Sequence, residues 1–121
     1  NFKTRYLIND YCVKNKKILI SAAINKFDGQ LFNFDFRNKS ACFRCFMPQI
    51  PNDEINCQTD GIITTLAGMA GSLQANEVIK SILNIKNKKK GNVMIFNSLS
   101  SDFRIVKLLK NPDCKNKNLH G

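Results

Sequence analysis

The spacing of apolar residues along this chain predicts helices and strands in turn. Residues 2–13 carry apolar side chains at helical spacing, which predicts a helix. Residues 17–23 form a short apolar run of strand length that follows a basic turn. From Gly29 to residue 36, phenylalanines alternate with other residues, so this segment is predicted to be a second, half-buried strand.

The rest of the chain is predicted to contain a long loop, then helices, and then strands. Residues 38–60 contain two prolines and little periodicity, which predicts a long loop. Residues 61–85 have apolar positions three or four apart and two glycines at an expected kink, so we expect a pair of helices. Residues 93–98 and 103–109 have the pattern of adjacent antiparallel strands, and an irregular tail follows. These elements predict one domain of the α/β class.

The charge and the hydropathy narrow the range of partners. The formal net charge is +10, but the basic residues are scattered among asparagines, without interleaved aromatics or a recognisable reading helix. We therefore interpret them as solvated loop charge that could steer an acidic protein, and we expect no nucleic-acid partner. No apolar run approaches the roughly 18 to 20 residues of a membrane helix, so we expect no membrane partner. The start of the chain lacks the apolar core of a signal peptide, and we expect a processed or partial, cytoplasmic protein.

Candidate chemistry lies in the five cysteines. Cys42 and Cys45 form a Cys-x-x-Cys pair, which supplies two of the four ligands of a tetrahedral zinc site. Cys114 is a plausible third ligand, and His120, the only histidine, could complete a site with three thiolates and one imidazole. The alternatives are a degenerate site that holds no metal and a set of buried structural thiols.

Cys57 stands apart from this group, just before the helix that we expect to start near residue 60. A thiol close to a helix N-terminus has a lowered pKa and a larger thiolate fraction, so Cys57 is a candidate reactive cysteine. The alternative is an inert cysteine in the loop or the core. Cys12 falls on an apolar helical face and is expected in the core.

Seven segments occur in an order that resembles one enzyme family. They are "NFKTRYLIND", "ISAAINKFDGQL", "CFRCFMP", "NCQTDGI", "GMAGSLQANEVIK", "FNSLSSDFR" and "NPDC". Together they resemble the carboxy-terminal half of the HesA/MoeB/ThiF adenylyltransferases, which activate ubiquitin-like sulfur carriers and are related to the ubiquitin-activating enzymes. The resemblance implies the C-terminal half of a Rossmann-like, mixed-sheet fold, so residues 1–121 would be a single partial domain without the N-terminal ATP-binding half.

The resemblance also implies roles for the cysteines. Cys42, Cys45 and Cys114 match three of the family's structural zinc cysteines, while Lys117 stands where the fourth would be. Cys57 matches the cysteine on the loop that crosses over the tail of the carrier protein, and it is the one catalytic residue that we assign.

ATP and Mg²⁺ are expected to bind mainly to the absent half. Neither G-x-G-x-x-G nor G-x-x-x-x-G-K-[ST] occurs in the chain. Asn1 and Arg5 follow the position of the family's magnesium ligand and are our candidate cofactor-binding residues, although an arginine on a helix is more often a surface partner in an ion pair.

The implied reaction is adenylation of the C-terminal Gly-Gly of a ubiquitin-like sulfur carrier, after which displacement of AMP by a persulfide donor leads to the carrier's thiocarboxylate. The pathway would be molybdenum cofactor or thiamine biosynthesis. Small residues around Gly68 and Gly71 would suit a homodimer interface or a plain core. Two other functions stay open: a carrier-binding module without ATP-site activity, and a small zinc protein that binds nucleic acid.

Overall fold

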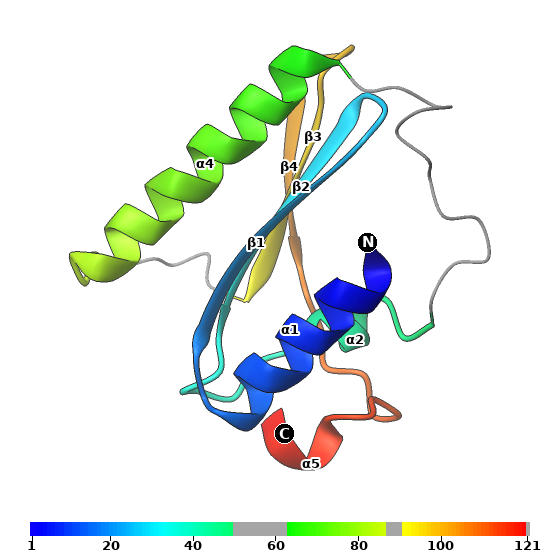
Figure 1. The fold of residues 1–121 in the computed structure, drawn as a ribbon, viewed down its shortest axis with the longest axis vertical. Coiled ribbons are helices and arrows are strands. Elements are labelled where there is room, and N and C mark those ends of the chain that lie inside the picture. Colours follow the sequence, from blue (N-terminus) through cyan, green and yellow to red (C-terminus); the bar gives the residue numbers. More distant parts are fainter. Residues whose placement is uncertain (50–62, 87–90, 121) are drawn as a thin grey trace.

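The computed structural model describes residues 1–49, 63–86 and 91–120. Its four strands form one antiparallel sheet in the order β1-β2-β3-β4 (Figure 1). The elements, in chain order, are α1 Phe2–Lys14, β1 Ile18–Asn25, β2 Asp28–Asp35, α2 Phe43–Phe46, α4 Thr64–Ile82, β3 Asn92–Asn97, β4 Asp102–Lys107 and α5 Lys117–His120. The predictions of an α/β class, of the first helix and of four strands are confirmed.

Strand β2 of the sheet is covered on both faces, whereas β4 is exposed along its whole length. The long helix α4 packs along β1 and β2 on one face, while α1, α2 and α5 gather at the other end of the molecule (Figure 1). Strand β2 is therefore buried on both faces, and Asn33 is only 5% exposed. The prediction of a half-buried strand was wrong because alternation of phenylalanine with polar residues does not reveal that α4 covers the polar side as well.

An aromatic core lies on the α1 side of the sheet. Phe32, Phe34 and Phe36 point to this face, and neighbouring rings are 5.6 and 5.4 Å apart between centroids. Phe43 of α2 meets Phe32 edge to face at 5.6 Å, and Tyr6 of α1 lies 5.3 Å from Phe43. Aromatic pairs of this kind are worth about 0.5–1.5 kcal/mol each beyond the area they bury. This core fixes α1 and α2 against the sheet.

Helix α4 is a single helix of 19 residues, so the predicted kinked pair was wrong for the described residues. Leu66, Ala70 and Glu77 form one stripe toward the sheet, at spacings of four and seven that keep them on a single helical face. Gly68 and Gly71 lie on the outer side, where an added Cβ would meet nothing within 4 Å. A glycine lowers helix propensity by about 1 kcal/mol, and the packed stripe outweighs that cost.

The predicted loop and tail also contain short helices. Helix α2 occupies four residues inside the segment predicted to be a loop, and α5 occupies four in the tail predicted to be irregular. The remainder of the predicted loop, from residue 50 to residue 60, lies outside the described residues. Neither short helix has enough residues to show a period in the sequence.

Candidate metal centre

Helix α1 anchors the segment that carries the Cys-x-x-Cys pair. The Oδ1 atom of Asn9 accepts a hydrogen bond of 2.9 Å from the backbone N–H of Phe43. Next to it, Asp10 accepts two bonds from the guanidinium of Arg44, at 2.7 and 2.8 Å. These contacts hold Phe43 and Arg44, the two residues between the cysteines, so packing sets the direction of both thiols.

The Cys-x-x-Cys pair forms a tight turn at the start of α2. The backbone N–H of Cys45 donates to the carbonyl of Cys42 at 3.0 Å. The two Sγ atoms lie 4.0 Å apart, and Cys42 is fully buried. The turn therefore presents two thiols to the same point.

The C-terminal segment brings the other two candidate ligands to that point. The Sγ of Cys114 lies 3.7 Å from the Sγ of Cys42. The Nε2 of His120 lies 3.4 Å from the Sγ of Cys45 and 3.4 Å from the Sγ of Cys114. Asn116 ties the segment to α1, because its Nδ2 donates to Asp10 at 2.9 Å. The structure thus places together the four residues that the sequence proposed as metal ligands.

The spacing of these atoms fits a tetrahedral ion. All four ligand atoms lie within 4.8 Å of one another. Zinc–sulfur bonds of about 2.3 Å and zinc–nitrogen bonds of about 2.0–2.1 Å at tetrahedral angles put sulfur atoms about 3.8 Å apart and nitrogen about 3.6 Å from sulfur. The observed sulfur pairs at 3.7 and 4.0 Å and nitrogen–sulfur pairs at 3.4 Å match this within the usual scatter. The cluster could hold a metal ion.

Burial controls the protonation of the cluster. It raises the pKa of the Cys42 thiol, and it raises the pKa of the Cys114 thiol to about 12. Burial also lowers the pKa of His120, which favours the neutral imidazole that a metal requires. The Nδ1 atom of His120 is buried without a hydrogen-bond partner in the part of the chain that the structure describes. Without a metal, the buried thiols are protonated at neutral pH.

The remaining predicted site residues lie elsewhere. Asn1 caps α1, and its side chain accepts a hydrogen bond of 2.8 Å from the N–H of Thr4. The Arg5 guanidinium lies 5.8 and 5.6 Å from the ring centroids of Phe2 and Phe43, and burial lowers its pKa. Arg5 forms no ion pair with any described residue, and it faces a cavity of about 190 Å³.

The other two cysteines of the chain are Cys57 and Cys12. Cys57 lies outside the described residues. Cys12 packs, partly buried, against the aromatic core, in agreement with the prediction, and burial raises its pKa.

Three supporting residues were not identified from the sequence. Asn9, Asp10 and Asn116 connect α1 to both halves of the thiol cluster. Asparagine is frequent throughout the chain, so neither amide carries a distinguishing signal. For Asp10, the sequence offers one indication of a supporting role: it is an acidic residue on a predicted helix in a chain of strongly positive net charge.

No helix among the described residues has the length and hydropathy needed to cross a membrane.

Comparison with known sequences identifies relatives over nearly the whole chain. The family described as "ThiF family" matches residues 1–116. The chain is 37% identical over 117 residues to "Adenylyltransferase and sulfurtransferase MOCS3" of Drosophila virilis, which covers 94% of this chain and 26% of the relative. It is 37% identical over 112 residues to "Probable molybdopterin-synthase adenylyltransferase" of Pyropia yezoensis, covering 90% of this chain and 29% of the relative. The chain therefore spans about a quarter of the length of the curated relatives it matches.

Solved structures share the fold. E. coli MccB, in a complex described with AMPCPP and selenomethionine MccA, aligns with a TM-score of 0.77 at 17% identity, over 100% of this chain and 37% of that chain. E. coli MccB with ATP aligns with a TM-score of 0.74 at 17% identity, over 99% of this chain and 36% of that chain. At this identity the likeness supports the fold alone.

Proposed function

The chain belongs to the ThiF family, and we propose that the protein is an adenylyltransferase that activates the C-terminal carboxylate of a ubiquitin-like sulfur carrier. The observation that carries the proposal is the 37% identity, over 94% of the chain, to a relative named as an adenylyltransferase and sulfurtransferase. A carboxylate becomes a reactive acyl donor only after its oxygen is made a good leaving group. Adenylation with ATP achieves this, and a persulfide sulfur donor would then displace AMP.

Within this proposal the thiol cluster holds a structural Zn²⁺. Three thiolates and one neutral imidazole suit zinc, which prefers sulfur and nitrogen ligands in a closed tetrahedral site. The burial of Cys42, Cys114 and His120, which are at most 4% exposed, favours a structural role because substrate could not reach an ion there. The ion would join α2 to α5, two segments separated by more than 60 residues in the sequence.

The nucleotide would bind mainly outside residues 1–121, which we propose are a partial domain. Asn1 and Arg5 would lie at the edge of the ATP and Mg²⁺ site. The cavity beside Arg5 supports this placement, because it opens between α1 and the edge strand β1. Cys57 would act after adenylation, in sulfur transfer. We also propose a homodimer and a cytoplasmic location; the four described cysteines, all free thiols, support the latter.

An alternative is a carrier-binding module without enzymatic activity. The relatives with high identity are named as adenylyltransferases, which favours the enzyme. Val78, Ile79 and Ile82 of α4 are exposed, which is compatible with either function because both need a scaffold that binds protein.

The test is carrier-dependent exchange of pyrophosphate into ATP, measured with the full-length, zinc-loaded protein. Exchange is expected with a ubiquitin-like protein that ends in Gly-Gly, and none is expected when the last glycine is removed. Cys57→Ala should retain exchange and lose thiocarboxylate formation, because adenylation needs no thiol. Cys12→Ala serves as the matched thiol control and should retain both steps. Absence of exchange in the folded wild-type protein would leave the binding module as the better account.

A further inference from the structure

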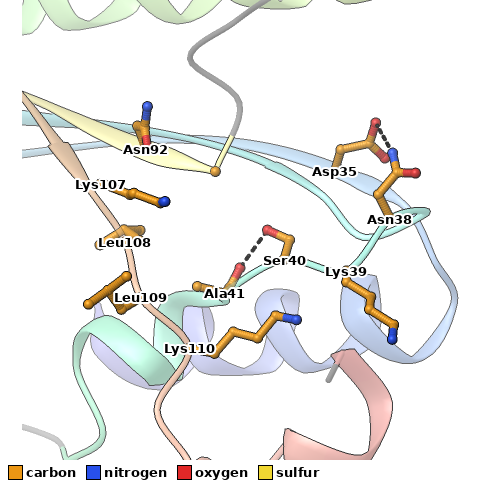
Figure 2. A pocket seen from close by; sticks show the side chains of 11 residues that line it. Asp35, Asn38, Lys39, Ser40, Ala41, Asn92, Lys107, Leu108, Leu109 and Lys110 are labelled. Carbon is orange, nitrogen blue, oxygen red and sulfur yellow. Dashed lines mark hydrogen bonds between the residues drawn. The ribbon is translucent and has the colours of Figure 1, made fainter.

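A basic cavity lies where the sheet meets the thiol cluster. Its volume is about 430 Å³, within the range of small-ligand sites. The connection from β2 to α2 forms one wall, and the end of β4 with the chain beyond it forms the other (Figure 2). Neither wall belongs to the metal centre itself, although each leads into it, at Cys42 and at Cys114.

The charge of the lining is unbalanced. Lys39, Lys107 and Lys110 line the cavity, and none of them forms an ion pair with a described residue. Asp35 is the one acidic residue of the lining, and the guanidinium of Arg37 already binds its carboxylate with two bonds of 2.8 Å. Among the described residues of the lining, cationic side chains therefore outnumber carboxylates.

The backbone adds hydrogen-bond donors. Within the described ranges, the amide N–H groups of Lys39, Ser40 and Ala41 make no hydrogen bond to another residue, although Ala41 is only 4% exposed. The Ser40 hydroxyl donates to the carbonyl of Ala41 at 2.9 Å (Figure 2). Successive backbone N–H groups can form anion-binding concavities.

The identity of the lining residues indicates the class of anion. All three cations of the lining are lysines, which bind phosphate groups as point charges. No aromatic side chain is among the lining residues, so the cavity offers no stacking surface for a nucleobase. A compact anion fits these features better than a nucleotide or an acidic peptide.

We propose that this cavity binds free inorganic phosphate or pyrophosphate. The anion joins the Lys39–Ala41 segment to the segment that follows β4, so it stabilises the approach of the two segments that carry the thiols. The proposal does not depend on the adenylation reaction, because it follows from the lining of the cavity alone.

The test is residue-resolved acetylation of lysine amines in the full-length, zinc-loaded protein, with peptide mass spectrometry as the readout. Sodium chloride matches the ionic strength in every sample. When the pyrophosphate concentration is about twice the dissociation constant, about a third of the protein molecules have an empty cavity. If only those molecules react, acetylation of Lys39, Lys107 and Lys110 should slow about threefold. Lys26, in the turn between β1 and β2 at the opposite end of the sheet, should react at an unchanged rate. This residue-level readout separates the cavity from any nucleotide site elsewhere in the protein.

Variants and a second ligand complete the test. Lys107→Gln with Lys110→Gln should abolish the protection of Lys39, while Lys26→Gln should preserve it; zinc content and circular dichroism verify the fold. Protection at lower concentration by pyrophosphate than by phosphate indicates a two-phosphate site, and the reverse indicates a single-phosphate site. Adenosine should protect none of the lysines. Uniform protection that includes Lys26, survival of Lys39 protection in the double variant, or protection by adenosine would each overturn the proposal.

Discussion

Replacing His120 by alanine tests the composition of the metal centre, because it removes one candidate ligand and leaves all three thiols in place. The Nε2 atom of His120 lies 3.4 Å from the sulfur atoms of both Cys45 and Cys114. Its Nδ1 atom has no partner among the described residues, so the substitution removes only the contacts that Nε2 makes with these two sulfur atoms. The change in zinc affinity should therefore report on the atom that would bind the ion.

The expected loss follows from the strength of comparable sites. Structural zinc sites bind with about 10–16 kcal/mol of apparent free energy at neutral pH. If the four ligands contribute about equally, His120→Ala costs roughly 3 kcal/mol, which is on the order of a hundredfold in the dissociation constant. A water molecule that takes the vacant position would reduce this loss without abolishing it.

A compensating variant comes from the local geometry. The N–H of Lys117 donates to the carbonyl of Cys114 at 3.0 Å, which repeats the 3.0 Å bond from Cys45 to Cys42. Position 117 therefore occupies the same place in its turn as Cys45 occupies in the Cys-x-x-Cys pair. Lys117→Cys should restore zinc affinity in the His120→Ala background, and Lys117→Ala alone should bind zinc as tightly as the wild type.

The assay is competition for zinc against a chromogenic chelator, with cobalt(II) absorption as a second readout of the ligand set. His120→Ala should shift the cobalt spectrum while retaining its thiolate charge-transfer band. An affinity of His120→Ala within about twofold of the wild type, well below the predicted hundredfold, would refute ligation by His120. In that case only the three thiols would bind the ion, and the agreement of the nitrogen–sulfur distances of His120 with a zinc site would be fortuitous.

Three further predictions address stability and proton coupling. Gly29→Ala should lower the free energy of unfolding by about 1–3 kcal/mol or more in chemical denaturation, because the new Cβ would lie 2.2 Å from the ring of Phe96. Asp10→Ala should lower it by about 1.5–3 kcal/mol in the same assay, since it removes charge-assisted hydrogen bonds that hold α2. The raised pKa values of Cys42 and Cys114, the latter about 12, mean that zinc displaces protons from both thiols. With two protons released per ion, zinc affinity should therefore rise by about a hundredfold per pH unit near neutrality, measured by chelator competition at two pH values.

The metal ligands could be proposed from the sequence because their signal is local. Cys42 and Cys45 lie within one turn, and three thiols with a single histidine leave few combinations. The burial of β2 could not be predicted in the same way. Asn33 is buried because its amide donates to Glu77 of α4 at 2.9 Å, a contact between residues 44 positions apart. A polar residue whose partner is distant in the sequence looks like a residue that faces solvent.

The two short helices show why local patterns fail near the metal centre. Helices α2 and α5 have four residues each, and helices of that length are unstable on their own in water. Contacts from elsewhere must therefore stabilise them: Asn9 and Asp10 bind α2, and Asn116 connects α5 to Asp10. Helix α5 itself is held by a hydrogen bond from Lys16 to the carbonyl of Leu119 and by the contacts of His120 with the thiols, so its order depends strongly on what the thiol cluster binds. Removing the metal should consequently release α5 before it disturbs α2, which keeps its aromatic contacts with the sheet.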